Sequence, residues 1–366
     1  MIRILVATDA WRPQVNGVVH SLEAMAKAAG ALGAEVRFLT PDGFRSFPLP
    51  TYNEIRLALA TPGAVRARVE AEHAASWPID HIHIATEGPI GMATRRFCLR
   101  AGRVFTTSFH TRFPEYLAAR TMLPARTTKG IAYAWLRRFH NAAAGVMVST
   151  PSLERELRER GFGRLMTWSR GVDCDLFRPR ETSVLDLPRP IFLNVGRIAV
   201  EKNIKAFLDL DLPGSKVLVG DGPARASLEK AHPEAHFLGL QKGEDLAAIY
   251  ASADVFVFPS VTDTFGMVLL EAIACGTPVA AFPVPGPNDV IGGSTAGALD
   301  PDLRTACLRA LALSRADARA HALTFTWRES ARQFVDNVVG ANPVVQETVL
   351  GEKRKFLRYR QRVQRG

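Results

Sequence analysis

The sequence predicts an α/β fold of two domains, each built on a parallel, doubly wound sheet of Rossmann-like type. Three observations predict it. Short β-type apolar runs alternate with helical patterns, which is typical of parallel sheets covered by helices on both faces. A stretch rich in proline and charge at 178–190 interrupts this alternation, and a second series follows it. The length of 366 residues exceeds what one hydrophobic core usually supports.

The first series supplies an amino-terminal domain at 1–178, which we expect a carboxyl-terminal helix at 326–366 to complete. Its candidate strands are IRILVAT at 2–8, EVRFLT at 35–40, HIHIAT at 81–86, VFTTSF at 104–109 and GVMVST at 145–150. Helical patterns separate these strands at 17–32, 89–101, 128–143 and 151–160. The last of these helices follows a serine and threonine cap and begins with Pro151.

The second series supplies a domain at 186–325. Its candidate strands are IFLNVG at 191–196, KVLVG at 216–220, HFLG at 236–239, DVFVFPS at 254–260 and PVAAF at 278–282. Open α/β sheets bind ligands beyond the carboxyl ends of their strands. Two facing units therefore place a site in the cleft between them, and functional residues should follow strands directly.

Composition excludes several classes of protein. Hydrophobic residues make up 47% of the chain and charged residues 22%, as in globular proteins, so extensive disorder is not expected. The four cysteines are widely spaced and form no C-x-x-C pair, which favours reduced thiols in a cytoplasmic protein. No run of about 18 apolar residues occurs, and the opening MIRILVATDAW is interpreted as a strand instead of a signal peptide.

The net charge of +10 is concentrated in two segments. Seven basic residues and one acidic residue occupy 351–366, and ten basic residues and one acidic residue occupy 95–138. The second segment interleaves its cations with side chains such as Phe97, Phe113 and Trp135. Such a mixture suits an anionic bilayer, where each basic residue contributes on the order of 1 kcal/mol, so we expect peripheral binding at the inner face of the cell membrane. A solvated helix face and a disordered tail are the alternatives.

Two positions in the cleft are suited to phosphate. Asn16-Gly17 precedes an amphipathic helix without a G-x-G-x-x-G motif, so a usual dinucleotide site is not predicted, although glycine lets the backbone approach an anion. Arg197 and Lys202 stand five residues apart after the first strand of the second series. This pair can clamp a diphosphate and replace a metal in stabilising a departing nucleotide.

The stretch FPSVTDTFGMVLLEAIACGTPVAA carries the strongest signal. Asp263 lies in the loop after a strand, and Glu271 lies eight positions later, just over a turn into a helix that opens near Gly266. The amides of Gly266, Met267 and Val268 are suited to phosphate oxygens. The two carboxylates can accept hydrogen bonds from vicinal hydroxyls, one on a sugar and one on a ribose. As isolated acids they would be a helix cap and a surface charge.

In this combination the chain resembles the retaining glycosyltransferase family 4, whose GT-B fold has two facing Rossmann-like domains. Each matching piece is weak, but together they cover nearly the whole chain. The matching stretches run in order through Asn16-Gly17, His110, Arg170-Gly171-Val172-Asp173, Gly196-Arg197, Glu201-Lys202-Asn203, Gly220-Asp221-Gly222-Pro223, 263–271 and FTWRESARQF at 325–334.

The resemblance implies a nucleotide-diphosphate sugar as donor, retention of configuration, and no metal or other cofactor. It implies that the diphosphate is held by Gly17, Arg197, Lys202 and the amides of Gly266, Met267 and Val268. It implies further that Glu271 binds the ribose and that His110, at the carboxyl end of a strand, reaches the transferred sugar. Asp263 stands where the family usually has glutamate, which shortens the reach by one methylene and leaves the sugar open.

Within the family, ATDAWRPQVNGVV, HIATEGPIG and SFHTRFPEY are most similar to bacterial glycolipid synthases that glycosylate diacylglycerol. This similarity implies transfer of a glucuronosyl or hexosyl group from a UDP-sugar to a lipid acceptor. For a uronic acid donor, His110 or Arg112 could supply the cation that its carboxylate needs. A mannosyltransferase that uses GDP-mannose and phosphatidylinositol or another acceptor is the alternative.

Three other classes compete with this interpretation. A nucleic-acid-binding protein would explain the positive charge, but the sequence has no recognisable nucleic-acid-binding motif, and no nucleic-acid partner is expected. A nucleotide-sugar epimerase of the same fold would need neither a lipid acceptor nor a basic tail. A catalytically silent scaffold is the third, and Asp263 is the residue that favours it.

Overall fold

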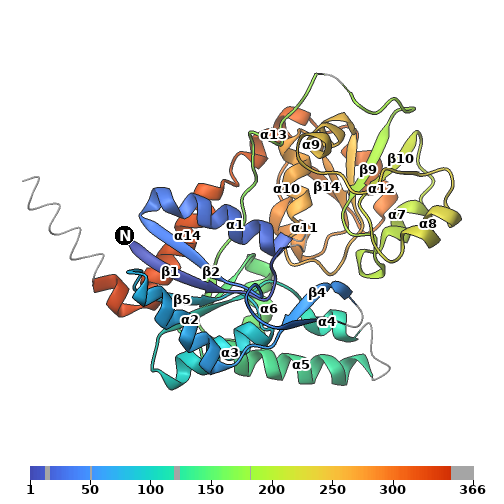
Figure 1. Cartoon of the computed structure of the whole chain (residues 1–366). Helices are drawn as coiled ribbons and strands as arrows, with labels where there is room; N and C mark the ends of the chain where they lie inside the picture. The colour runs from blue at the N-terminus through green and yellow to red at the C-terminus, as the bar shows by residue number, and fades with distance from the viewer. Residues whose placement is uncertain (13–16, 50–51, 119–123, 182, 348–366) are drawn as a thin grey trace, which may run out of the picture.

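The computed structural model describes residues 1–12, 17–49, 52–118, 124–181 and 183–347. Two α/β lobes face each other, as the sequence predicts, and the carboxyl-terminal helix returns from the second lobe to the first (Figure 1). Asn16, the basic tail at 351–366 and residues 119–123 of the basic segment lie outside the described residues. None of the described helices is long and apolar enough to cross a bilayer.

The first lobe is built on a parallel sheet of six strands in the order β2-β1-β5-β6-β7-β8. The strands are β1 (Ile2–Ala7), β2 (Ala34–Leu39), β5 (His81–Ile84), β6 (Phe105–Phe109), β7 (Gly145–Val148) and β8 (Leu165–Thr167). The helices are α1 (Gly17–Ala29), which a short 3-10 turn (Gly30–Leu32) extends, α2 (Pro62–Ala74), α3 (Pro89–Arg100), α4 (Phe113–Ala118), α5 (Ala125–His140) and α6 (Pro151–Glu159).

The first sheet has a hydrophobic core on each of its two faces. Ile4 and Val6 of β1 pack with α1 and with α14 (Trp327–Ala341), whereas Leu5 and Ala7 pack with α2 and α3. Successive side chains of a strand point to opposite faces, so one apolar run serves both. The helix α14 therefore belongs to the core of the first lobe, although it follows the whole second lobe in the sequence.

The second lobe repeats this architecture in the order β11-β10-β9-β12-β13-β14, again entirely parallel. Its strands are β9 (Ile191–Val195), β10 (Ser215–Val219), β11 (His236–Phe237), β12 (Val255–Phe258), β13 (Val279–Ala281) and β14 (Gly297–Leu299). Its helices are the 3-10 turn η2 (Val200–Lys202), α7 (Ile204–Leu208), α8 (Arg225–Ala231), α9 (Gly243–Ser252), α10 (Met267–Ala274), α11 (Pro285–Val290), α12 (Leu303–Ala310) and α13 (Arg315–Ala322).

The chain passes between the lobes twice, and the two connecting segments lie side by side. The Val172 amide donates to the Phe325 carbonyl at 3.0 Å. A Cβ atom on Gly171 would lie 2.4 Å from the backbone nitrogen of Trp327, so only glycine allows this approach. The crossing at 171–172 and the crossing at 325–327 thus form one compact junction.

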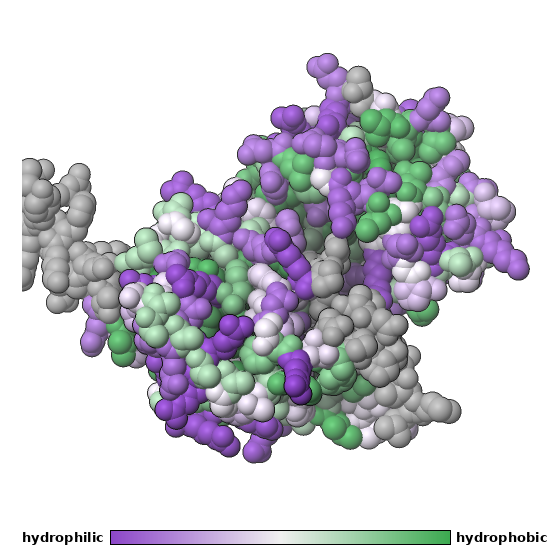
Figure 2. Space-filling view, in the orientation of Figure 1, coloured by the Kyte–Doolittle hydropathy of each residue, from purple (hydrophilic) through white to green (hydrophobic). Residues whose placement is uncertain are grey.

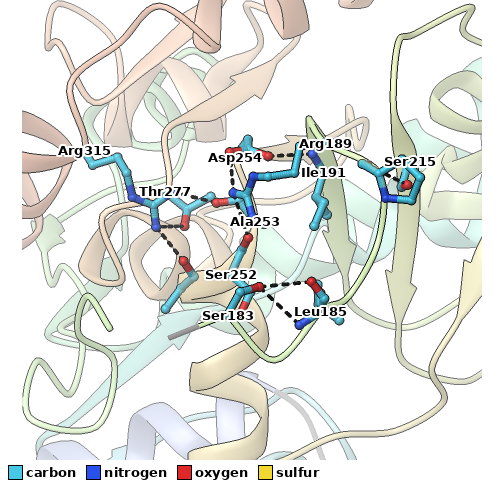
Figure 3. Close-up of polar contacts among 12 residues, drawn as sticks. Ser183, Leu185, Arg189, Ile191, Ser215, Ser252, Ala253, Asp254, Thr277 and Arg315 are labelled. Carbon is cyan, nitrogen blue, oxygen red and sulfur yellow. Dashed lines mark hydrogen bonds and ion pairs between the residues drawn. The ribbon is translucent and has the colours of Figure 1, made fainter. Parts of the chain in front are cut away.

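The linker before β9 is fixed to the second lobe at the amino ends of its strands (Figure 3). The Arg189 guanidinium donates to Asp254, whose other carboxylate oxygen accepts from the Ile191 amide at 2.6 Å. Nearby, Arg315 donates to the carbonyls of Ala253 at 2.6 Å and Ala251 at 2.7 Å. These bonds satisfy backbone carbonyls at the end of α9 that would otherwise lack donors.

Several elements of the structure were not predicted from the sequence. They include the antiparallel pair β3 (Ser46–Leu49) and β4 (Tyr52–Ala58), the helix α2, and the short strands β8 and β14. The helix α2 buries only Val65 and Val69, which is too narrow an apolar stripe to identify a helix. The cysteines Cys98, Cys174, Cys275 and Cys307 are free thiols, as predicted.

Candidate active site

The lobes meet where the N-termini of two helices face each other. The helix α1 begins at Gly17 after β1, and α10 begins at Met267 after β12. A Cβ atom on Gly17 would lie 3.5 Å from Cγ of Met267, and the Ser21 hydroxyl lies 3.9 Å from the Met267 sulfur. The surface is hollowed between the lobes (Figure 2). The N-termini of α1 and α10 therefore meet at the boundary between the lobes.

Gly266 leaves the end of α10 free for a ligand. Its φ of 84° is in the left-handed region, and it provides no side chain to cap the helix. A Cβ atom there would lie 3.0 Å from Cδ1 of Leu269 and 3.1 Å from the Phe258 ring. Glycine is thus required by conformation and by space, and it keeps the amides of Met267 and Val268 accessible to an anion.

Lys202 and Asp263 form an ion pair at the edge of the second sheet. The Lys202 ammonium lies 2.6 Å from Oδ1 of Asp263, whereas Oδ2 of Asp263 is buried without a hydrogen-bond partner in the described chain. The Asn203 amide group donates to the Pro259 carbonyl at 3.1 Å, which joins the loop after β9 to the loop after β12. Arg197, half-buried, lies at this same edge. Lys202 and Asp263 are therefore brought together, and Arg197 follows β9 at the same edge of the sheet.

Glu271 is held by a tyrosine that the sequence analysis missed. The Tyr250 hydroxyl on α9 donates to Oε2 of Glu271 at 2.9 Å. Burial raises the pKa of Glu271 to about 7, although the hydrogen bond from Tyr250 opposes this shift. The carboxylate is thus partly protonated at neutral pH before any ligand binds.

His110 is held from both lobes. Its Nδ1 lies 2.9 Å from a guanidinium nitrogen of Arg170, and its ring contacts Trp168 edge-on with centroids 5.6 Å apart. The Thr264 hydroxyl of the second lobe donates to the His110 carbonyl at 2.8 Å. This interlobe bond places His110 beside the loop that carries Asp263.

The structure corrects one expectation about charge. Burial, and then the charge of Arg170, lower the pKa of His110 well below its ordinary value, so His110 is neutral. The expectation that His110 supplies a cation to a uronic acid is therefore wrong. Arg112 is also poorly placed to supply this positive charge, because its guanidinium lies 2.8 Å from the Glu156 carboxylate and only 11% of its side chain is exposed.

Buried polar atoms that have no hydrogen-bond partner among the described residues lie at the edges of the sheets around this cleft. They include Nε2 of His110, Oδ2 of Asp263 and the hydroxyls of Ser149, after β7, and Ser260, after β12. Leaving such a group unsatisfied costs about 1–3 kcal/mol. Their concentration beyond the carboxyl ends of the strands indicates that a polar ligand completes the site.

Asp9 organises the first lobe at the same edge and was missed by the sequence analysis. Its carboxylate accepts from the amides of Ile90 at 2.8 Å and Gly91 at 3.2 Å, and from the Thr86 hydroxyl at 2.9 Å. It thereby caps α3 from outside the helix. One signal existed, since Asp9 directly follows the strand predicted at 2–8, but the sequence did not indicate its partners on α3.

Two other features do not add to this site. No cluster of three or more His, Cys, Asp or Glu side chains suited to a metal ion occurs within the described ranges. A hollow of about 310 Å³ opens at the amino ends of the second sheet, lined in part by Arg189, Asp254 and Arg315. Those charged groups already bind protein atoms, as Figure 3 shows, so we assign no ligand to it.

Two family models match the chain. "Glycosyltransferase Family 4" matches residues 15–176, and "Glycosyl transferases group 1" matches residues 189–313. The first match lies in the first lobe, and the second match lies in the second lobe.

Two curated relatives show how far the similarity extends. A GDP-mannose-dependent alpha-mannosyltransferase of Mycobacterium tuberculosis is 30% identical over 82% of this chain and 84% of its own length. The sulfoquinovosyl transferase of Arabidopsis thaliana is 32% identical over 68% of this chain, but the match spans only half of that longer protein.

Solved structures share the fold. A sucrose-phosphate synthase from Thermosynechococcus elongatus aligns with a TM-score of 0.66 at 20% identity, covering 98% of this chain and all of the other. The Anabaena protein HepE, in complex with UDP and glucose, aligns with a TM-score of 0.68 at 16% identity, covering 93% of this chain and all of the other. The protein thus has the GT-B fold, and with its relatives and family models it is a glycosyltransferase that belongs to glycosyltransferase family 4.

Proposed function

We propose that the protein transfers a glucuronosyl or hexosyl group from a UDP-sugar to a lipid acceptor, diacylglycerol, with retention of configuration and without a metal ion. The observation that carries this proposal is the meeting of the α1 and α10 N-termini beside Lys202. A diphosphate in this cleft would receive backbone donors from two helices and positive charge from Lys202 and Arg197.

In this reaction the bond between C1 of the sugar and the diphosphate oxygen breaks, and a bond from C1 to the acceptor oxygen forms on the same face. The acceptor proton passes to the leaving phosphate. Lys202, Arg197 and the helix amides would stabilise the negative charge that builds on the diphosphate. Glu271 would accept hydrogen bonds from the ribose, and Nε2 of His110 and Oδ2 of Asp263, both unpartnered among the described residues, would contact the transferred sugar.

The exposed surface of α4 and α5 supports a lipid acceptor. Ile131 is 66% exposed, Phe113 46% and Trp135 39%, and the exposed basic residues Arg137 and Arg138 share α5 with two of them. Hydrophobic residues lie among hydrophilic ones along the lower edge of the first lobe, where α5 runs (Figure 2). Apolar side chains beside cations suit an anionic bilayer and would place the enzyme where diacylglycerol resides.

A second candidate is a mannosyltransferase that uses GDP-mannose. The similarity to a GDP-mannose-dependent relative across most of both chains favours it. The test offers labelled UDP-glucose, UDP-glucuronic acid or GDP-mannose with vesicles containing diacylglycerol or phosphatidylinositol, with and without a chelator. We expect UDP-sugar label in the organic phase with diacylglycerol, undiminished by the chelator.

Each other result rejects part of the proposal. Label from GDP-mannose alone would replace it by the second candidate, and loss of turnover with the chelator would reject metal independence. Conversion of a UDP-sugar without acceptor would indicate an epimerase. No label in any lipid would reject the lipid acceptor.

Membrane binding is tested separately by co-sedimentation with vesicles that contain anionic lipid. We expect Ile131→Asp combined with Trp135→Asp to release the enzyme from vesicles, because it removes apolar contacts and adds negative charge. Val184→Asp, at a residue 56% exposed in the linker of the second lobe, serves as the control and should still bind. Equal binding of the double variant and the control would reject this surface.

A further inference from the structure

Arg170 is a buried arginine whose donors are divided between the backbone and His110. It follows β8 and is only 5% exposed. One terminal nitrogen donates to the Trp168 carbonyl at 2.7 Å and the Ser169 carbonyl at 3.2 Å. Its guanidinium carbon lies 4.2 Å from the centre of the Trp168 ring, which fixes the plane of the group. The other terminal nitrogen is directed to Nδ1 of His110 at 2.9 Å.

This contact determines where His110 carries its proton. Arginine is a donor only, so Nδ1 of His110 must accept and therefore has a free lone pair. A neutral imidazole carries one proton, which must then reside on Nε2. Nε2 is the nitrogen that is buried without a partner in the described part of the chain. The ring thus presents a single N–H donor that no group among the described residues accepts.

The surroundings keep this state over a wide pH range. Besides burial, the charges that lower the pKa of His110 are those of Arg170, of His83 on β5 and of His140 on α5. A second proton on His110 would place two like charges 2.9 Å apart in a buried site, so protonation is disfavoured. The hydrogen bond from Thr264 fixes the backbone of the same residue.

We propose that Arg170 is a positioning residue that locks His110 as its Nε2–H tautomer, so that His110 offers one fixed hydrogen-bond donor to a hydroxyl of the transferred sugar. The inference rests on the proposed function only for the identity of the sugar hydroxyl that accepts this hydrogen bond. The tautomer itself does not depend on any substrate. A purely structural role, in which Arg170 only ties the loop after β8, would leave the tautomer independent of Arg170.

The experiment compares Arg170→Lys with Arg170→Met, two side chains of similar length of which only lysine donates. Long-range proton–nitrogen NMR of histidine-labelled enzyme without substrate reports the tautomer, with His110→Gln identifying the signals. We expect Nε2–H in the wild type and in Arg170→Lys, and a mixture with Nδ1–H in Arg170→Met. Turnover of the donor that the wild type accepts should fall about tenfold or more in Arg170→Met and less in Arg170→Lys.

Arg315→Met is the matched control, because Arg315 also donates to buried backbone carbonyls but at the far end of the second lobe (Figure 3). It should lower stability and leave the His110 signals unchanged. A proton on Nδ1 in the wild type, or an unmixed Nε2–H tautomer in folded Arg170→Met, would overturn the proposal. If every donor fails with every acceptor, the proposed function is rejected while the NMR result still decides the tautomer.

Discussion

The two lobes share one architecture but differ in what their sheets bury. In the second lobe, β9, β12 and β13 bury side chains such as Phe192, Leu193, Phe256 and Val279, with Asn194 a polar exception on β9. In the first lobe, β5 and β6 bury two histidines and three hydroxyl residues, namely His81, His83, Thr106, Thr107 and Ser108. The two lobes have the same fold but different core chemistry.

The polar core of the first lobe is a continuous network. His83 contacts the Thr106 hydroxyl at 2.9 Å through Nδ1 and the Ser108 hydroxyl at 2.9 Å through Nε2. Trp168 packs between His83 and His110, with ring centroids 6.0 Å and 5.6 Å away. Buried polar groups that are all satisfied fix one arrangement of a core. The first lobe therefore buries polar side chains in its sheet near His110, where the sheet of the second lobe buries mainly apolar side chains.

The largest expected effect of this difference is acid sensitivity. Burial lowers the pKa of His81 to about 3 and the pKa values of His83 and His110 well below their ordinary value of 6.5. Below pH 6.5 these histidines bind protons in the unfolded chain but not in the folded protein. The free energy of unfolding is therefore highest above that pH and falls as the pH drops below it. For His81, whose pKa is about 3, the loss at pH 5 is about 2 kcal/mol, and His83 and His110 add to this loss in the same direction. Urea unfolding at pH 7 and pH 5 measures it.

Two variants sharpen this measurement. His83→Gln should reduce the loss of stability between pH 7 and pH 5 by the contribution of one histidine, whatever its effect on stability at pH 7. Leu136→Ala, at a buried position on α5, should destabilise at both pH values by about 2–5 kcal/mol and leave the difference between them unchanged. Equal pH dependence in His83→Gln and the wild type would contradict the assignment of this effect to the network.

The next effect lies in the second lobe and concerns charge at the cleft. Lys202→Met should lower kcat/KM by about 10²–10³, because it removes a cation from the proposed diphosphate site. Lys205→Met is the control, since Lys205 is exposed and pairs with Asp209 on the same helix surface. Initial rates at saturating and limiting donor measure the loss. A threefold change or less in a stably folded Lys202→Met would exclude Lys202 from the site.

The smallest effect concerns the buried pair in the second lobe. In the proposed function Glu271 would bind the ribose as a carboxylate, so its pKa of about 7 should make donor affinity improve as pH rises from 6 to 8. Tyr250→Phe removes the hydrogen bond that lowers this pKa, so the midpoint should move to higher pH and donor KM at pH 7 should rise about tenfold. Donor titrations across this range test it, and an unmoved midpoint would be evidence against the role of Glu271.

The sequence predicted the long buried strands and failed on short or weakly patterned elements. Apolar runs such as IFLNVG identified β9 because a strand buried on both faces needs no alternation. Three-residue strands such as β8 and β14 leave no periodicity to detect. They exist because the neighbouring strand offers them unpaired backbone groups, as β7 does for β8.

By itself the sequence determined that the candidate charged residues stand at one edge of each sheet, because parallel strands bring every carboxyl end to one edge. Only the tertiary structure decided which of them touch and in which protonation state. Arg170 reaches His110 across 60 residues and Lys202 reaches Asp263 across 61, through contacts of 2.9 Å and 2.6 Å. Hydrogen bonds depend on register and burial to a fraction of an ångström, and pKa values depend on the same burial. Neither hydrogen-bond geometry nor burial can be derived from the local sequence.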